Sequence, residues 1–183
     1  MGVTLEIPPR ELDLLNFYRA SELHGGLVLG QVARHARGNE LTLELTRHSA
    51  EEIVHAQLWT ETILAVGGEV RPVRETYQSR YAAALGAPAT LLQVLALTQV
   101  FERRVYRHFT AHLRRPGTHP AVAATLRRML EEEKGHLAWV KRWLDRRAVA
   151  CGAEVAATLR RCAEADARIY GELSEEFGWR EAA

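Results

Sequence analysis

The sequence contains two copies of a pentad in which a pair of acidic residues is followed by a histidine three positions after the second acid. One copy is Glu51-Glu52-Ile53-Val54-His55 and the other is Glu132-Glu133-Lys134-Gly135-His136. A Glu and a His three residues apart lie on one face of an α-helix, so both can bind one metal ion or a bridged pair. With 20 Glu and 8 His in 183 residues, chance supplies roughly one Glu-x-x-His, and requiring the preceding acid lowers that expectation to about a tenth.

Two further glutamates stand apart from other acidic residues. Glu22 is the only acid in residues 14–39, and Glu102 is the only acid in residues 76–130. Glu102 shares its predicted helix face with apolar residues such as Leu95. A carboxylate in an apolar core costs several kcal/mol unless it is paired or binds a metal. An ion pair with a neighbouring arginine is the alternative for Glu102, but four Glu and two His together favour a metal site.

The donor types restrict the metal. Carboxylate oxygens with two imidazoles suit iron or manganese, whereas a copper or structural zinc site would use thiolates. The cysteines, Cys151 and Cys162, are eleven residues apart and match neither a zinc spacing nor a redox pair. Four carboxylates balance the charge of two divalent ions. Such a pair can leave open positions for dioxygen or peroxide.

Helices must position these residues, because apolar side chains recur at helical spacing and no stretch alternates with the period of a strand. We predict an all-α fold. Glycine or proline follows each of the first three segments, and Thr90 is placed to cap the third. The predicted helices span residues 11–37, 41–66, 90–113, 120–148 and 153–177.

The connections predict how the helices are paired. Short turns join the first helix to the second and the third to the fourth, so each pair should form an antiparallel hairpin. The connection 67–89 is predicted to be a long loop that crosses the length of the bundle. We therefore expect a four-helix bundle over residues 1–148 with one long crossover. Residues 149–183 should add a C-terminal helix to the same domain, packed on the bundle or on a partner subunit.

These features resemble the ferritin-like di-iron carboxylate superfamily, which has one Glu on each of two helices and Glu-x-x-His on each of the other two. The resemblance covers about residues 11–148. The stretch 129–139, Met-Leu-Glu-Glu-Glu-Lys-Gly-His-Leu-Ala-Trp, is similar to the fourth helix of bacterioferritin and rubrerythrin. The resemblance implies two iron ions, and manganese or a mixed pair would suit the same donors.

The resemblance also implies a role for each ligand. Glu22 and His55 would be terminal ligands of one iron, and Glu102 and His136 would be terminal ligands of the other. Glu52 and Glu133 match the bridging carboxylates. These six residues would also carry the catalysis.

The acid before each bridging Glu has a separate implied role. In this superfamily it accepts a hydrogen bond from the metal-bound histidine of the opposite hairpin. Glu51 would then hold His136, and Glu132 would hold His55. The alternative is that Glu51 and Glu132 are ordinary solvated helix residues.

Other residues near the predicted ligands allow two interpretations each. His48 lies one turn before Glu52 and is predicted to be a core or supporting residue rather than a ligand. Gln99 lies one turn before Glu102 and could bind it through a hydrogen bond. Gly25 and Gly26 follow Glu22, where they either leave space for an oxidant or allow close helix packing.

The predicted function is a redox enzyme, an oxidase, peroxidase or hydroxylase, that reacts with dioxygen or peroxide. Iron oxidation for storage, of the ferritin or bacterioferritin type, is the alternative. The sequence lacks the paired Cys-x-x-Cys motifs of rubredoxin, so electrons should come from a separate donor. The length of the final segment favours a homodimer over a storage shell.

Composition limits the partners and the compartment. The net charge is +1, and the basic residues are 22 Arg and 2 Lys. A near-neutral chain does not favour a nucleic-acid partner. The charge-free stretch 81–101 has the length of a membrane span, but Gly86 and Pro88 interrupt it, so we expect a loop followed by a buried helix. No signal peptide is recognisable, and we expect a cytoplasmic protein without a membrane partner.

Overall fold

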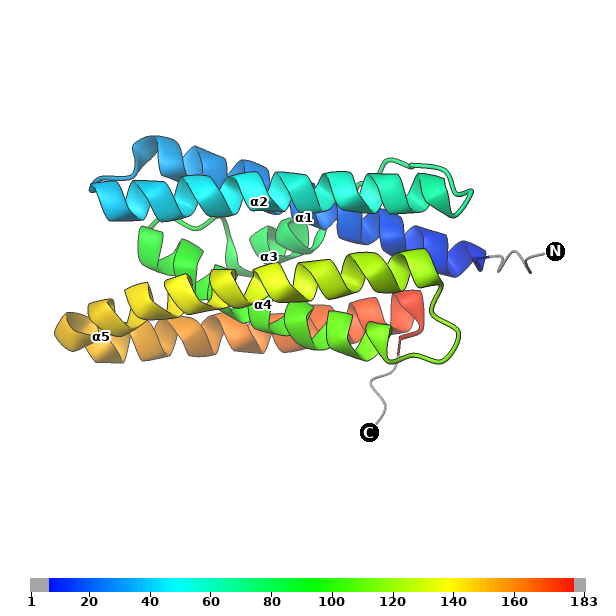
Figure 1. The fold of residues 1–183 in the computed structure, drawn as a ribbon. Helices are drawn as coiled ribbons and strands as arrows, with labels where there is room; N and C mark the ends of the chain where they lie inside the picture. Colours follow the sequence, from blue (N-terminus) through cyan, green and yellow to red (C-terminus); the bar gives the residue numbers. More distant parts are fainter. Residues whose placement is uncertain (1–6, 180–183) are drawn as a thin grey trace. The chain divides into compact units, whose positions relative to one another are not determined.

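The computed structural model describes residues 7–179, and within them all regular secondary structure is helical. This confirms the predicted all-α class for the described part of the chain. The first six residues of the predicted bundle and the last four of the predicted C-terminal segment lie outside the described residues. The helices are α1 (Pro9–His35), α2 (Asn39–Ala65), α3 (Tyr77–Leu85), α4 (Leu91–Leu113) and α5 (Pro120–Phe177) (Figure 1).

The chain divides into two compact units. Unit 1 contains the residues up to Gln78 together with Leu113–Arg127, and unit 2 contains Ser79–His112 together with the chain from Arg128 onward. Each unit is thus built from two separate stretches of sequence. The predicted bundle over residues 1–148 with an added helix over 149–183 stays a prediction.

In unit 1, α1 and α2 form the predicted antiparallel hairpin and run side by side (Figure 1). Gly38 connects them with a φ of 96°, a conformation that other residues rarely adopt. The helices pack closely because a Cβ atom on Gly26 would lie only 2.8 Å from Ile53 Cδ1. The Ser49 hydroxyl donates to the Gly26 carbonyl at 2.7 Å. Of the two interpretations of Gly26, close packing is confirmed.

The segment that follows α2 is held against α1 by hydrogen bonds to Asn16. The Asn16 amide group donates to the Glu69 carbonyl at 3.1 Å, and its carbonyl oxygen accepts from the Arg71 backbone at 2.7 Å. Asn16 is buried, so these hydrogen bonds satisfy polar groups that water cannot reach. The connection therefore follows a defined path beside the helix that carries Glu22.

The prediction that residues 67–89 form only a loop is wrong, because α3 occupies Tyr77–Leu85 within that connection. Tyr77 and Tyr81 lie one turn apart, and both side chains are buried. A helix of nine residues is too short for its apolar residues to establish a helical period, so it has little signal in the sequence. Gly86, with a φ of 78°, follows its last residue.

The start of α4 confirms the predicted cap. The backbone N–H of Gln93 donates to Thr90 Oγ1 at 3.2 Å, and Gln93 Oε1 accepts from the backbone N–H of Thr90 at 3.3 Å and from that of Ala89 at 2.8 Å. This reciprocal arrangement is a capping box, in which two backbone donors at the helix end are satisfied. It fixes where the helix that carries Glu102 begins.

The long helix α5 is interrupted at Cys151, whose φ of −146° and ψ of 53° are not helical. We call residues 120–150 its first arm and residues 152–177 its second arm. The break lies between the two predicted helices. Within unit 2 the two arms run side by side (Figure 1).

The second arm of α5 packs against α4 of its own chain. The Asp166 carboxylate lies 2.8 Å from Arg104 Nη2, and His108 Nδ1 lies 3.2 Å from the Tyr170 hydroxyl. These contacts hold the second arm against α4 within unit 2, and its predicted packing on the bundle or on a partner subunit stays a prediction.

The charge-free stretch 81–101 is split between α3, the following loop and α4. Within residues 7–179, no helix combines the length and the apolar character needed to cross a lipid bilayer.

Candidate metal centre

Unit 1 brings together Glu22 from α1 and the Glu52–His55 pair from α2. Their exposed fractions are 3%, 1% and 0%, respectively. One donor atom from each residue lies within 4.8 Å of the others. His55 Nδ1 lies 3.7 Å from Glu22 Oε2 and 4.0 Å from Glu52 Oε1. The predicted helical pattern therefore places these three side chains at one buried point.

The distances from His55 Nδ1 to the two carboxylates exceed the usual length of a hydrogen bond, about 2.7–3.2 Å. Ligands that bind one cation at about 2.0–2.2 Å lie roughly 3–4 Å from each other. The separations of 3.7 and 4.0 Å match that second range. This buried group could hold a metal ion.

Unit 2 contains the other three predicted ligands. Glu102 lies on α4, and Glu133 and His136 lie on the first arm of α5. All three side chains are buried, with exposed fractions of 2%, 0% and 1%. Donor atoms of Glu102 and His136 lie within 4.8 Å of each other, and His136 Nδ1 lies 3.2 Å from Glu133 Oε2. Each unit thus contributes two of the predicted carboxylate ligands and one of the predicted imidazole ligands.

The two Glu-x-x-His pairs use the same atoms. In both, the Nδ1 atom of the histidine faces a carboxylate oxygen of the glutamate one turn earlier, at 4.0 Å for His55 and 3.2 Å for His136. The spacing of three residues places the two side chains next to each other on the helix surface. The repeated sequence pattern therefore corresponds to a repeated arrangement of donor atoms.

His48 belongs to the same buried region of unit 1. Its side chain is 0% exposed, and its Nε2 atom lies 3.1 Å from Glu52 Oε1. An ionised carboxylate can only accept, so the imidazole donates this hydrogen bond. The spacing of four residues indicates that His48 lies next to Glu52 on the helix. It does not distinguish a histidine that only packs in the core from one that contacts a proposed metal ligand.

The buried carboxylates are sites at which a cation would be favourable. Each unit buries two glutamates at this region, and a buried carboxylate loses several kcal/mol of hydration. One divalent cation in each unit would neutralise its two carboxylates. The imidazoles would complete the coordination without adding charge.

The outer acids, Glu51 and Glu132, are half-buried. Glu51 lies 3.9 Å from Arg47 Nε, and its side chain is 38% exposed. Glu132 accepts a hydrogen bond from Arg128 Nε at 3.1 Å and is 34% exposed. Their implied roles, with Glu51 holding His136 and Glu132 holding His55, stay predictions.

Gly25 has a different environment from Gly26. A Cβ atom on Gly25 would lie 3.3 Å from Glu52 Oε2 and 3.2 Å from Gln78 Nε2. Glycine therefore allows the Glu52 and Gln78 side chains to lie close to α1 at this position, and the predicted space for an oxidant stays a prediction.

Gln99 lies on α4 one turn before Glu102, and its side chain is 3% exposed. Its Oε1 atom is buried without a hydrogen-bond partner among the described residues. Buried acceptors are usually satisfied by protein, water or an ion. The predicted hydrogen bond from Gln99 to Glu102 stays a prediction.

Compared with known proteins, the chain matches no family model, no curated protein and no solved structure. The ligand set therefore rests on the residues and their geometry, and the ferritin-like family remains a proposal.

Proposed function

We propose that the protein is a di-iron carboxylate oxidoreductase of the ferritin-like type that reacts with dioxygen or peroxide. The observations that carry the proposal are the buried group of Glu22, Glu52 and His55 in unit 1 and, in unit 2, the buried His136, whose donor atoms lie close to those of Glu102 and Glu133. The six proposed ligands are Glu22, Glu52, His55, Glu102, Glu133 and His136. Unit 1 supplies the first three, and unit 2 supplies the others.

The donor set fits iron. Carboxylate oxygens and imidazoles are ligands that Fe²⁺ and Mn²⁺ accept, and no cysteine belongs to either group. Four carboxylates neutralise two divalent ions. A di-iron centre would supply one-electron redox chemistry and positions at which dioxygen or peroxide can react.

The residues around the ligands have roles that follow from their contacts. His48 donates to Glu52 Oε1 and so restrains the orientation of that carboxylate. Gly25 allows the Glu52 carboxylate to lie close to α1, because a Cβ atom there would be only 3.3 Å from Glu52 Oε2. Burial of the ligands excludes water and strengthens every electrostatic interaction in the site.

Metal analysis tests the ligand set directly. The purified protein is loaded anaerobically with Fe²⁺, dialysed and measured for metal per chain, and the proposal expects two ions. Glu133→Gln should lower this number, because it removes one charged donor. Glu131→Gln is the matched control, since Glu131 lies two positions earlier, is 75% exposed and pairs with Lys134. Equal metal content in the two variants would contradict the ligand set.

Reactivity tests the oxidoreductase part of the proposal. The iron-loaded protein is reduced and mixed with dioxygen or with peroxide, and oxidant consumption is followed together with the iron absorption spectrum. Repeated turnover in the presence of an added electron donor would support the proposed oxidoreductase function. Two bound ions that react with neither oxidant would overturn this part while leaving the ligand set intact.

Iron storage uses similar ligands, so the size of the assembly separates the two functions. A dimer with two irons per chain agrees with the proposed enzyme. A particle of hundreds of kilodaltons with an iron core would replace it with the storage function.

A further inference from the structure

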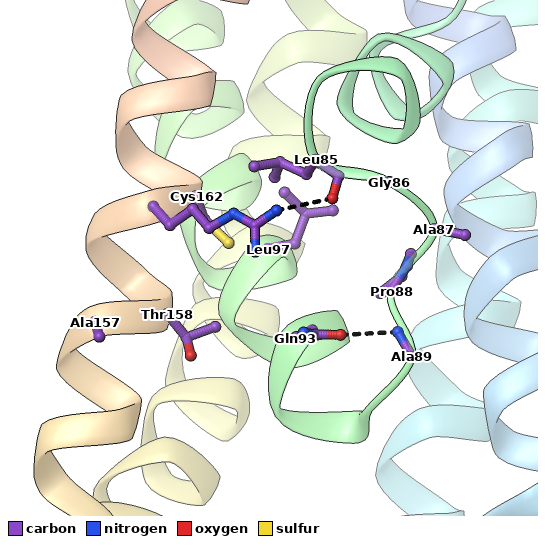
Figure 2. A pocket seen from close by; sticks show the side chains of 11 residues that line it. Leu85, Gly86, Ala87, Pro88, Ala89, Gln93, Leu97, Ala157, Thr158 and Cys162 are labelled. Atoms are coloured by element: carbon purple, nitrogen blue, oxygen red, sulfur yellow. Dashed lines mark hydrogen bonds between the residues drawn. The ribbon is translucent and has the colours of Figure 1, made fainter.

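Unit 2 contains a cavity of about 330 Å³ that the proposed metal chemistry does not use. The loop after α3, the first turns of α4 and the second arm of α5 form its walls (Figure 2). Ligand pockets in proteins have volumes of about 300–1,000 Å³, so this one is large enough for a small organic molecule.

The walls are mainly apolar. Leu85, Pro88, Leu97 and Ala157 present carbon atoms to the cavity, and Figure 2 shows Pro88 and Ala157 on opposite sides of it. An apolar ligand body would therefore gain the hydrophobic contribution of about 25 cal/mol for each Å² it buries.

Arg161 is the one residue with a permanent charge among those that line the cavity. Its Nη2 atom donates to the Leu85 carbonyl at 3.0 Å, which holds the guanidinium group against the end of α3. No described acidic side chain forms an ion pair with Arg161. A guanidinium group carries five N–H donors, so this one retains donors for a bound anion.

The remaining polar groups of the cavity carry no negative charge. Gln93 Oε1 is occupied by the backbone N–H groups of Ala89 and Thr90, and the Thr158 hydroxyl donates to the Glu154 carbonyl. Burial raises the pKa of the Cys162 thiol above its ordinary value, although the Arg161 guanidinium acts in the opposite direction. The thiol is therefore protonated at neutral pH and does not repel an anion.

We propose that this pocket binds a small monocarboxylate with an apolar body, its carboxylate held by the Arg161 guanidinium and its body packed against Leu97 and Pro88. The planar guanidinium group can donate two parallel hydrogen bonds to a carboxylate, a geometry that suits this anion better than a single point charge. The site is independent of the proposed metal centre.

Calorimetry with three probes tests both parts of this chemistry. Octanoate has the charge and the apolar body, octanol has only the body, and acetate has only the charge. Octanoate should bind at least about tenfold more tightly than either of the others, because a charge-assisted hydrogen bond contributes about 1.5–3 kcal/mol. Equal affinities for octanoate and octanol, or no octanoate binding at about 10 mM, would overturn the proposal.

Variants locate the binding. Arg161→Gln should weaken octanoate binding by about tenfold or more and leave octanol binding unchanged. Arg160→Gln is the matched control, because Arg160 is exposed on the same arm and does not line the cavity. Ala157→Phe should fill the cavity and weaken both probes. If Arg161→Gln and Arg160→Gln have the same effect, or if Ala157→Phe binds octanoate normally, the pocket is not the binding site.

Discussion

At the scale of single residues, the contact between His48 and Glu52 changes the interpretation of the site. The Nε2 atom of His48 lies 3.1 Å from the carboxylate of a proposed ligand, and both side chains are buried. Partners of this kind fix the orientation of a ligand without binding the metal themselves. We therefore predict that His48 is a positioning residue rather than a ligand in the proposed centre.

His48→Gln should lower the affinity for Mn²⁺ by about tenfold to a hundredfold, the usual effect of losing such a partner. Two ions per chain should still bind at saturation, because the six proposed ligands remain. Equilibrium dialysis measures both quantities. His55→Gln provides the comparison and should reduce the number of ions bound, so a similar loss in the two variants would instead make His48 a ligand.

The two cysteines should differ in reactivity. Cys151 is half-buried at the break in α5, whereas Cys162 is buried and burial raises its thiol pKa. The thiolate is the reactive form, so iodoacetamide at about pH 8 should modify Cys151 first. Mass spectrometry of the modified peptides gives the order. Faster modification of Cys162 would contradict the described burial.

The same pKa shift predicts a pH dependence of stability. A thiol whose pKa is higher in the folded protein favours folding below its unfolded pKa of about 8.5. That contribution is lost as the pH rises through the folded-state pKa. The unfolding free energy of the wild type should therefore fall more steeply above about pH 8.5 than that of Cys162→Ala, as urea titrations can measure.

At the scale of elements, Asp166 joins three helices of unit 2. Its Oδ1 atom accepts from the Tyr81 hydroxyl of α3 at 2.6 Å, and its Oδ2 atom lies 2.8 Å from Arg104 Nη2 of α4. The Asp166 side chain is 5% exposed. The second arm of α5 is thus fixed to its neighbours by a buried ion pair.

Asp166→Asn should destabilise the protein by about 3 kcal/mol, because it leaves the Arg104 charge without its partner in a poorly hydrated place. Asp145→Asn is the control, since Asp145 pairs with Lys141 at the surface and is 62% exposed. It should change the unfolding free energy by less than about 1 kcal/mol. Equal urea midpoints for the two variants would show that the buried pair is not important for stability.

Two glycines should respond to substitution in opposite directions. Gly38 has a φ of 96°, so Gly38→Ala should destabilise the α1–α2 hairpin by about 1 kcal/mol. Gly171 lies inside the second arm of α5, where a Cβ atom would meet open space. Gly171→Ala should stabilise the protein by about 0.5–1 kcal/mol. Thermal unfolding measures both, and a shift of the same sign in both would contradict this explanation.

The sequence predicts elements that have strong periodicity or clear end signals. The Glu-x-x-His spacing places Glu52 beside His55, and Thr90 with Gln93 marks the start of α4. The helix α3 has no such signal, because it is short and is stabilised by the burial of two tyrosines. The sequence shows that Asp166 lies on the apolar face of its helix. It does not predict the partners of Asp166, because they come from distant positions in the chain.

At the scale of the whole molecule, the chain passes between the two units at residues 78–79, 112–113 and 127–128. The proposed ligands are shared equally by the units, three in each. Neither unit is a continuous half of the sequence, so truncation at a single point does not isolate one set of ligands. Studies of the metal centre therefore need the full chain.

Metal binding should stabilise this chain considerably. Without a cation, the four buried glutamates disfavour the folded state through lost hydration and mutual repulsion. A divalent ion at about 100 times its dissociation constant should add about 2.7 kcal/mol to the unfolding free energy for each site. Thermal unfolding with Mn²⁺ and with a chelator measures this change. In the Glu102→Gln variant, most of the increase in unfolding free energy that metal binding causes at one site should disappear. The unfolding free energy of the metal-free variant should not be lower than that of the metal-free wild type.

The break at Cys151 has a practical consequence for engineering. The backbone dihedral angles already depart from helical values there, and Val149 nearby is 90% exposed. Exposed turns of this kind tolerate new chain ends and inserted sequences better than helix interiors do. A protein that carries a short affinity tag inserted before Gly152 should keep its helices while leaving every proposed metal ligand in place.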